Sequence, residues 1–453
     1  MIMYYPDDTI VAQSTAKGTA AIHIIRISGE DAIPIADKIF KAKTPLTSIS
    51  DNNSHFGKIY DGDKLIDEVL INLFHAPHSY TGEDVVEINC HGNQFIADLI
   101  MEVLLQHARL ANPGEFTQRA FINNKIDLTR AEAVGDLLSA STRYSHKVAI
   151  DQLEGKLEYK IKQYLDIITS LRMQLELEID FPEDYHKSIS KNELLDKITL
   201  LVNEIEELSD TGRDGRILRN GYKVCLVGKP NVGKSSIFNA FLKSERAIVS
   251  PMPGTTRDYL EEALSIDGFL VRFFDTAGLR SSDDQIEKIG IKRSREIINN
   301  SDLIVYVIDP DYKNKDLYLD EELPPDIDRL KVINKSDLLS PARIKELNEL
   351  MFIPCSTIST DGINNLKKNI IKMINIKPDK LDQPCLTNSR QLAAAKTCLS
   401  NLMHAKSALN QDYSIEFIAF DLLQASKSLE QITGVITSED ILDKIFSSYC
   451  IGK

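Results

Sequence analysis

The stretch GKPNVGKS, Gly228–Ser235, decides the fold of the central part of the chain. It fits the pattern G-x-x-x-x-G-K-[S/T] and directly follows the apolar run Val224–Val227. A strand, a glycine-rich turn and a helix start in this order predict a loop whose backbone N–H groups hold phosphate oxygens. Lys234 is expected to reach the β- and γ-phosphates, and the Ser235 hydroxyl to bind Mg²⁺. Taken alone, the motif also fits a glycine turn that simply enters a helix.

The base of the nucleotide is indicated by NKSD at residues 334–337, which follows the apolar run Leu330–Ile333. A carboxylate at Asp337 can accept two hydrogen bonds, from N1–H and the 2-amino group of guanine. Adenine offers no such pair of donors, so an acidic side chain here rejects ATP. Following a phosphate loop, this pattern predicts GTP.

Two further segments complete a GTPase pattern. DTAG at residues 275–278 ends the strand-like run Phe269–Phe274. There Asp275 is expected to hold Mg²⁺ through water, and the Gly278 N–H to sense the γ-phosphate. Thr256 is the expected second hydroxyl ligand of Mg²⁺, and Ser359 the last contact on the base side. These elements in this order predict an enzyme that hydrolyses GTP.

The hydrolysis machinery is less clear from the residues themselves. Leu279 stands where Ras-like enzymes have the glutamine that orients water. Either hydrolysis is poor or another residue orients the water, and each candidate could equally be a solvated loop residue. The candidates are Asp283, Asp284, Gln285 and Glu287. Arg257 and Arg280 lie close in sequence, but surface roles fit them as well as that of an arginine finger.

Composition limits the class of protein. At 453 residues, about two to four domains are expected. A net charge of −14 argues against a surface coated with basic groups for unspecific nucleic-acid binding, although a local basic face stays open. The six cysteines form no C-x-x-C pair, which disfavours zinc and disulfide frameworks. No apolar run has the length of a membrane span and no targeting pattern is visible, so a cytoplasmic protein without membrane partners is expected.

The pattern of apolar residues differs between the central segment and the segments on either side of it. The hairpin turn Asp267-Gly268 and the apolar run Leu303–Ile308 predict a doubly wound α/β sheet. Apolar residues from Leu153 to Leu175 and from Leu194 to Leu208 recur at helical spacing, and residues 211–215 are expected to end the second helix. Residues 386–448 also look helical, interrupted near Gly434. We expect the two flanks to pack together around an inserted central domain; two independent helical hairpins are the alternative.

Residues before 120 predict a separate α/β domain, with strands at 19–27, 69–74 and 85–90 and helices at 32–40 and 94–107. Three unusual stretches outside the central segment lie at residues 79–92, 112–121 and 446–453. Read by themselves, they are a turn and strand, a loop capping a helix, and a frayed terminus.

Together these motifs resemble the TrmE/MnmE family of tRNA-modifying GTPases. The resemblance covers essentially the whole chain. The central segments that carry it are Gly228–Ser235, Ala247–Asp258 and Asp275–Arg280; the more specific ones are RISG at 26–29, TGED at 81–84, PGEF at 113–116 and CIGK at 450–453.

The resemblance implies that K⁺ takes the place of an arginine finger. Asn231 is then its side-chain ligand, and Ser250, Met252 and Thr255 lie in the loop that supplies its other ligands. Glu287 becomes the residue that orients water, so the implied catalytic residues are Glu287, Lys234 and Asn231. The implied GTP contacts are Asn231, Val232, Gly233, Lys234, Ser235, Ser236, Ser250, Thr255, Thr256, Asp275, Gly278, Asn334, Lys335, Asp337 and Ser359.

The resemblance also implies a tetrahydrofolate site at Arg26, Glu87, Lys125 and Lys453. A pterin has a guanine-like donor edge that suits Glu87, and its glutamate tail suits cationic side chains. Cys450 is implied to lie near the folate, where it could act as a nucleophile or merely pack. His91 could carry a proton, although a core or turn histidine is the commoner case.

The implied organisation is multidomain α/β plus all-α. Its parts are a folate-binding and dimerisation domain at 1–122, a helical domain at 123–216 and 379–453, and an inserted Ras-like G domain at 217–378. The implied function is K⁺-activated GTP hydrolysis that drives conformational change. A homodimer, joined with the FAD protein MnmG (GidA) in a heterotetramer or larger complex, forms the 5-carboxymethylaminomethyl or aminomethyl group on the wobble uridine of tRNA. The one-carbon donor is 5,10-methylene- or 5-formyl-tetrahydrofolate. A ribosome-assembly GTPase and a self-assembling regulatory GTPase are the alternatives.

Overall fold

The computed structural model describes residues 8–50, 54–181, 189–244, 247–248, 261–275, 295–310, 323–376 and 382–453. The chain forms two compact units. Unit 1 comprises residues 1–135, 153–194 and 404–453; unit 2 comprises 136–152 and 195–403. Each unit therefore joins segments that are far apart in the sequence.

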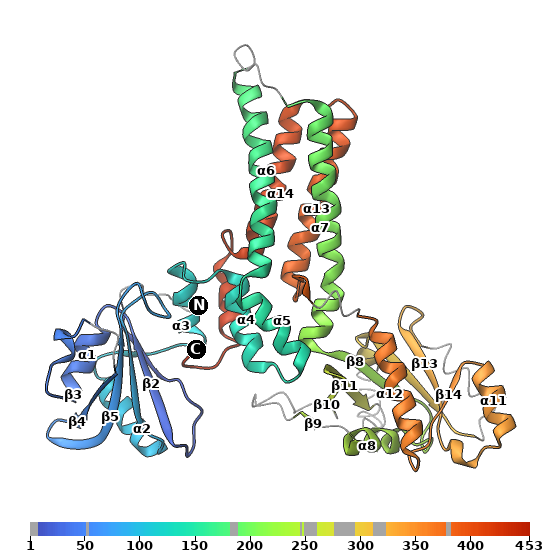
Figure 1. The fold of residues 1–453 in the computed structure, drawn as a ribbon, viewed down its shortest axis with the longest axis horizontal. Coiled ribbons are helices and arrows are strands. Elements are labelled where there is room, and N and C mark those ends of the chain that lie inside the picture. Colours follow the sequence, from blue (N-terminus) through green and yellow to red (C-terminus); the bar gives the residue numbers. More distant parts are fainter. Residues whose placement is uncertain are drawn as a thin grey trace, which may run out of the picture. The chain divides into compact units, whose positions relative to one another are not determined.

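Unit 1 begins with a seven-stranded sheet of order β3-β4-β5-β6-β2-β1-β7. Its neighbours are antiparallel except β1 and β7, which are parallel. The strands are β1 Ile10–Gln13, β2 Ile22–Ser28, β3 Phe40–Lys41, β4 Ser54–Asp61, β5 Lys64–Phe74, β6 Val85–His91 and β7 Arg109–Leu110. Helices α1 (Ala32–Ile39) and α2 (Gln94–Leu104) pack on the sheet (Figure 1). The predicted strands and helices of this region are confirmed to within a few residues.

The two faces of this sheet differ in character. Alternate residues such as Ile25, Ile71 and Ile88 are buried in one core together with α1 and α2. The opposite face carries Arg26 and Glu87, which are paired across β2 and β6. On that second face several apolar side chains are exposed, as described below.

Helices complete unit 1. They are α3 Glu115–Ile122, α6 Lys156–Asp180, α14 Ile415–Thr433 and α15 Glu439–Phe446, together with residues 128–135 of α4 (Leu128–Ser139). From Leu157 to Leu175, the predicted apolar stripe of α6 is buried, and α6 packs against α14. The predicted interruption near Gly434 is confirmed, because this glycine ends α14 at φ 88°.

The C-terminal segment is ordered against the first domain. Ile451 forms an isolated β-bridge with Pro113, and the Gly114 N–H donates to the Cys450 carbonyl at 3.3 Å. Gly452 has φ 96°, and a Cβ there would lie 2.5 Å from the Gln13 carbonyl oxygen. The interpretation of residues 446–453 as a frayed terminus is therefore wrong, because specific backbone contacts hold this segment.

Unit 2 contains a second seven-stranded sheet, of order β14-β13-β12-β8-β11-β10-β9. The five strands from β14 to β11 are parallel, and β10 and β9 continue antiparallel. The strands are β8 Tyr222–Val227, β9 Ala247–Ile248, β10 Glu261–Ile266, β11 Phe269–Asp275, β12 Leu303–Ile308, β13 Asp328–Ile333 and β14 Phe352–Pro354. The predicted doubly wound sheet is confirmed for this part of the chain.

Helices cover both faces of the second sheet (Figure 1). Apolar residues of α8 (Lys234–Ser244) and α12 (Thr360–Ile374) share one core with β8 and β11. Leu347 of α11 (Pro341–Glu349) packs on the opposite face against β12. The predicted hairpin turn joins β10 and β11, with Asp267 at φ 49° and Gly268 at φ 87°, as a type I′ turn requires.

Helix α7 runs unbroken from Lys191 to Asn220, so the predicted break at residues 211–215 is wrong. A Cβ on Gly215 would lie 2.1 Å from the Leu386 carbonyl oxygen, and one on Gly212 would lie 2.8 Å from Leu392. These glycines therefore allow residues 386–392 to approach the helix closely and do not end it. A single residue, Gly221 at φ 88°, separates α7 from β8.

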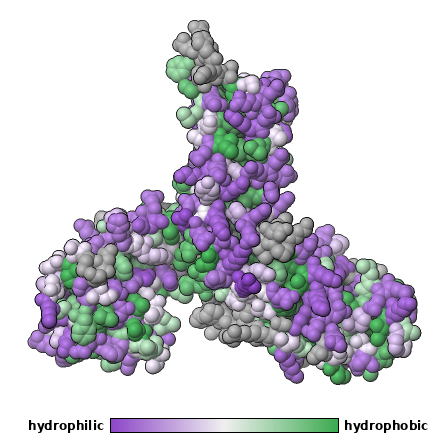
Figure 2. All heavy atoms as spheres, viewed as in Figure 1, coloured by the Kyte–Doolittle hydropathy of each residue, from purple (hydrophilic) through white to green (hydrophobic). Residues whose placement is uncertain are grey.

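The remaining helices are α5 Arg143–Leu153 and α13 Ser389–Asn410. Most of each lies in unit 2, but Leu153 and residues 404–410 belong to unit 1. Hydrophilic side chains cover most of the visible surface of the long helices, which fits inward-facing apolar stripes (Figure 2). Within the described ranges, no helix is both long and apolar enough to cross a membrane.

Candidate functional site

The predicted GTP motifs gather at the carboxyl edge of the parallel strands in unit 2. Strand β8 lies between β11 and β12, so the strand order reverses at this point. In open α/β sheets, ligands bind beside such a switch point. Residues 228–233 follow β8, Asn334 follows β13, and Asp275 ends β11.

The phosphate loop has the backbone that its sequence requires. Gly228 has φ 155°, and a Cβ there would lie 2.2 Å from the Val307 carbonyl oxygen. Gly233 has φ 96°, and its Cβ would lie 2.0 Å from Asn334 Nδ2. Asn231 occupies the left-handed region at φ 64°. Glycine is therefore needed at both positions, for conformation and for close approach.

Lys234 is buried inside this loop, at the start of α8. Its Nζ donates to the carbonyl oxygens of Gly228 at 2.8 Å and of Lys229 at 2.9 Å. A buried ammonium group whose donors lie on loop carbonyls can transfer them to phosphate oxygens, so the loop fits a polyphosphate. Ser235 and Ser236 follow on the first turn of α8 and are exposed.

The base-side motif is tied to the phosphate loop. Asn334 is buried, and its Nδ2 donates to the Val232 carbonyl at 2.9 Å. Its Oδ1 has no hydrogen-bond partner within the described ranges. Lys335 Nζ donates to the Asn231 carbonyl at 3.4 Å. The structure thus brings the two sequence motifs into one site.

Sequence reasoning missed Ser356. Its hydroxyl donates to Asp337 Oδ1 at 2.6 Å, which fixes the carboxylate expected to read guanine. Ser359 instead caps α12, accepting the Asp361 N–H at 3.3 Å. The position of Ser356, close behind β14 at the same sheet edge, is the signal that could have found it.

Several predicted residues lie outside the described part of the chain. They are Ser250, Met252, Thr255, Thr256, Gly278 and Glu287, together with the arginines and other loop candidates at 257 and 279–285. For Asp275, the backbone is described, paired with Leu226 at the end of β11.

A second cluster lies in unit 1, around Arg26 and Glu87. Arg26 donates to Glu87 Oε1 from Nε at 3.0 Å and from Nη2 at 2.7 Å. Its guanidinium also lies 5.6 Å from the centre of the Tyr80 ring and 5.5 Å from that of Phe116. Sequence reasoning gave no role to these two aromatic residues, which come from the TGED and PGEF stretches.

Lys453 belongs to the same electrostatic environment. Burial lowers the pKa of Lys453, and the positive charge of Arg26 lowers it further; Cys450 and Glu87 act in the opposite direction. The structure therefore brings together Arg26, Glu87, Lys453 and Cys450, which are far apart in sequence. Cys450 is the exposed cysteine, and the other five are buried.

Two other predicted residues have bonding partners outside the Arg26–Glu87 pair. Lys125 Nζ donates to the Pro77 carbonyl at 2.8 Å, and no contact with Arg26 or Glu87 is present among the described residues. His91 is largely exposed, and its Nδ1 pairs with the buried Asp67 at 2.7 Å. This geometry fits a surface histidine anchored by a buried carboxylate.

The motif acids Glu83 and Glu115 hold the scaffold together. Both contact the fully buried Arg119, at 3.1 Å and 3.2 Å. Arg119 also donates to Asp8 Oδ1 at 2.5 Å. This network ties Asp8 and Glu83 to α3.

Two family models match the chain. One, described as MnmE helical domain, matches residues 128–450, and the other, GTP-binding protein TrmE N-terminus, matches residues 9–125. The tRNA modification GTPase MnmE of Alkaliphilus oremlandii is 40% identical over 461 residues, covering 99% of this chain and all of the relative. Its namesake from Aquifex aeolicus is 40% identical over 453 residues, covering 98% of this chain and all of the relative.

Among solved structures, the FeoB G-domain from Methanococcus jannaschii is 27% identical. It covers 34% of this chain and 98% of that chain, with a TM-score of 0.25. The assignment of the G domain therefore rests on this chain's own strand order and motifs.

Proposed function

Because the chain belongs to the MnmE family of tRNA modification GTPases, we propose that it couples GTP hydrolysis to a folate-dependent modification of the wobble uridine in tRNA. The family makes it a GTPase with a TrmE-type N-terminal domain, and implies GTP and Mg²⁺ in the G domain and tRNA as the molecule modified. The FAD protein MnmG is the partner that we propose for the redox chemistry. The observation that carries the proposal is the cluster of Arg26 and Glu87 with Lys453 and Cys450.

In the G domain, the residues of the phosphate loop bind and orient GTP. Lys234 would exchange its loop carbonyls for the β- and γ-phosphates, and Ser235, Thr256 and Asp275 are the residues that would hold Mg²⁺. Asp337 selects guanine, with Ser356 in the supporting role first given to Ser359. Mg²⁺ supplies neutralisation of the charge that develops on the phosphate oxygens. The remaining proposed contacts are Asn231, Val232, Gly233, Ser236, Ser250, Thr255, Gly278, Asn334 and Lys335.

Glu287 is the residue that we propose orients the attacking water. Leu279 has no polar group for this task. Asn231, with the segment containing Ser250, Met252 and Thr255, is proposed to bind K⁺, which supplies the charge neutralisation of an arginine finger. The exposed side chain of Asn231 on the phosphate loop supports this assignment.

The GTPase proposal is tested by comparing salts. K⁺ should raise the rate of GTP hydrolysis far above the rate in Na⁺ at equal ionic strength. Equal rates in the two salts would contradict a K⁺ site at Asn231.

Glu287→Ala should lower kcat by roughly a hundredfold or more at nearly unchanged GTP affinity. A defect confined to affinity would move the water-orienting role to another residue.

The folate site is proposed at the exposed end of the Arg26 cluster. Glu87 can exchange its bond to Arg26 for the donor edge of a pterin, which frees the guanidinium for the carboxylates of the folate tail. Tyr80 and Phe116 flank Arg26 and offer apolar surface to a planar ring. Lys453 and Lys125 supply further positive charge. Cys450, as an exposed thiol, is available for a step with the one-carbon unit.

A homodimer is proposed through the second face of the first sheet. Ile22, Phe56 and Leu70 lie on this face in register with Arg26 and Glu87, and Phe56 is 63% exposed. An exposed apolar face of this kind marks a contact surface. A second copy seated there would lie beside the folate cluster.

The domain organisation stays as proposed from the sequence. Residues 1–122 form the folate-binding and dimerisation domain, 217–378 the inserted G domain, and 123–216 with 379–453 the helical domain. MnmG would join the homodimer in a heterotetramer or larger complex, in the cytoplasm where tRNA is modified.

Calorimetry with 5-formyl-tetrahydrofolate tests the folate assignment. Saturable binding is expected for the full chain, weakened at least about tenfold by Glu87→Gln because two charge-assisted bonds are lost. Glu102→Gln, on α2 at the other face of the sheet, removes the same charge and should leave binding unchanged. Absence of saturable binding would favour a ribosome-assembly or self-assembling regulatory GTPase.

Analysis of tRNA nucleosides tests the reaction itself. Cells without this protein should lack the aminomethyl-type group at wobble uridines, and a copy of the gene should restore it. An unchanged set of wobble uridines would overturn the proposed function even if GTP hydrolysis were intact.

A further inference from the structure

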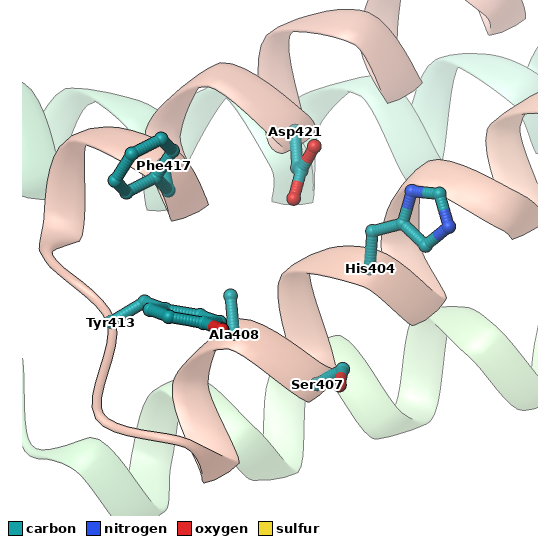
Figure 3. Close-up of a pocket in the computed structure, with 6 residues that line it drawn as sticks. All are labelled: His404, Ser407, Ala408, Tyr413, Phe417 and Asp421. Atoms are coloured by element: carbon teal, nitrogen blue, oxygen red, sulfur yellow. The ribbon is translucent and has the colours of Figure 1, made fainter.

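A pocket of about 310 Å³ lies where α13 turns into α14 (Figure 3). Its lining residues come from the end of α13, the connecting loop and the first turns of α14. They are His404, Ser407, Ala408, Tyr413, Phe417 and Asp421. None of these residues belongs to the GTP site or to the Arg26 cluster.

The pocket combines two aromatic rings with one carboxylate. The ring centres of Tyr413 and Phe417 lie 6.3 Å apart at an interplanar angle of 60°, so the rings form a corner. Asp421 lies one helical turn after Phe417, and its carboxylate points into the space between the helices (Figure 3). Aromatic faces and a carboxylate all attract a cation.

Asp421 is not held by a hydrogen bond from any described residue. In the part of the chain that the structure describes, no hydrogen bond or ion pair reaches its side chain. Burial raises the pKa of Asp421, and His404 opposes this shift. The nearby Asp412, by contrast, already pairs with Lys191. A carboxylate that is held by no hydrogen bond and lies beside two aromatic rings can bind a cationic group.

Guanidinium matches this pocket better than a compact ammonium group. Its plane can lie on an aromatic ring while its N–H groups donate to a carboxylate, as a rigid fork. No lysine or arginine lines the pocket, and Asp421 is acidic, so a phosphate-bearing ligand is disfavoured.

The exposed residues around the pocket indicate that the guanidinium belongs to an arginine side chain of a protein. Tyr413 and Phe417 are 57% and 64% exposed, and Phe420, on the same side of α14, is 57% exposed. Aromatic side chains and arginines are enriched at the centres of protein interfaces. The exposed aromatic surface extends beyond the pocket, over a larger area than a small cation could cover. It therefore fits contact with a protein.

We propose that the pocket between Tyr413, Phe417 and Asp421 binds an arginine side chain of a protein partner. Phe420 then packs against apolar surface of the partner next to that arginine. The interaction is independent of GTP and of folate, so its test can fail without affecting the function proposed above.

The test uses N-acetyl-L-arginine methylamide as the probe. The chain has no tryptophan, so Phe417→Trp introduces a single fluorescent reporter that keeps an aromatic ring in place. The probe should change the emission saturably, and the neutral isostere N-acetyl-L-citrulline methylamide should not. Saturation-transfer NMR with the unsubstituted chain should give the same preference.

Charge variants identify the carboxylate. In the reporter background, Asp421→Asn should weaken binding of the arginine probe about tenfold or more, since a charge-assisted bond is lost. Glu416→Gln removes the same charge from the first turn of α14, outside the pocket, and should leave binding unchanged. Equal weakening by both variants would reduce the effect to general electrostatic attraction and would overturn the proposal.

Spermidine separates the two possible sources of the cation. If it binds more than tenfold tighter than the arginine probe, the pocket is a site for a free polyamine and the partner assignment is wrong. No response to the arginine probe in either fluorescence or NMR would likewise overturn the proposal. Preference for the arginine probe over spermidine and citrulline supports it.

Discussion

The GTP site and the Arg26 cluster are built in opposite ways. The GTP site takes its residues from short motifs, each placed directly after a parallel strand, such as Lys234 after β8 and Asn334 after β13. The Arg26 cluster joins single residues of β2 and β6 with Cys450 and Lys453 of the C-terminal segment. A motif on one loop can be recognised locally, whereas a cluster of single residues depends on the fold that brings them together.

The largest expected effect concerns the locally encoded site. Lys234→Ala should lower kcat/KM for GTP roughly a thousandfold, because a buried charge on the transferred phosphoryl group is lost. Lys243→Ala, in the last turn of the same helix, is the matched control and should hydrolyse GTP normally. A decrease of less than about tenfold for Lys234→Ala would mean that Lys234 does not contact the phosphates.

The next effect tests whether the C-terminal segment completes the second cluster. In Gly452→Ala, a Cβ would meet the Gln13 carbonyl at a backbone conformation that favours glycine, so the segment must shift. Affinity for 5-formyl-tetrahydrofolate should fall about tenfold, which corresponds to roughly 1.4 kcal/mol. GTP hydrolysis by the same preparation should be unchanged.

Gly62→Ala is the control for that experiment. Gly62 also has a positive φ, 57°, but a Cβ there meets nothing within 4 Å. Its folate affinity should equal that of the unsubstituted chain. If both variants lose affinity alike, backbone strain in the domain accounts for the loss and contact with the C-terminal segment does not.

A third prediction concerns packing beside the G domain. Alanine is the better helix former by about 1 kcal/mol, yet Gly215→Ala in α7 should lower stability by about 1–3 kcal/mol. The added Cβ would lie 2.1 Å from a backbone oxygen, which cannot move aside as a flexible side chain could. The urea midpoint of helix loss, followed by circular dichroism, measures this. Asp210→Ala, at an exposed position of the same helix, should not lower the midpoint.

The smallest expected effects distinguish the roles of Ser356 and Ser359. Ser356→Ala should weaken GTP binding about fivefold, because a bond of about 1 kcal/mol no longer fixes Asp337. Ser359→Ala should leave GTP affinity unchanged and cost about 1 kcal/mol of stability through the lost cap of α12. Nucleotide titration and urea unfolding measure these two effects. Weaker GTP binding by Ser359→Ala, with normal binding by Ser356→Ala, would show that Ser359 is the contact on the base side.

The sequence predicted elements whose signals are local. The strands around Gly228, the turn at Asp267-Gly268 and the apolar stripe of α6 follow from periodicity and turn chemistry, and the structure has them. Gly215 was misread because glycine breaks an isolated helix, whereas here a neighbouring backbone requires its small size. That neighbour, Leu386, lies far along the chain, where no local pattern reveals it.

The same limit applies to the candidate sites. Ser356 and Ser359 are equally plausible hydroxyls in a sequence, and only the path of the chain after β14 distinguishes them. The resemblance supplied Arg26, Glu87 and Lys453 as a set, and the structure adds Tyr80 and Phe116 around them. The role of these two aromatic residues is visible only from their contacts with Arg26, which arise from tertiary packing.

The join between α7 and β8 has a mechanical consequence. The helix contains 30 residues, which at 1.5 Å per residue makes it about 45 Å long, and a single glycine, Gly221, links it to the strand that leads into the phosphate loop. A rigid rod attached by one residue acts as a lever arm with its fulcrum at the start of β8. A tilt of about 5° at that end displaces the far end by about 4 Å. A shift too small to alter the shape of the phosphate loop can thus become a movement as large as a side chain.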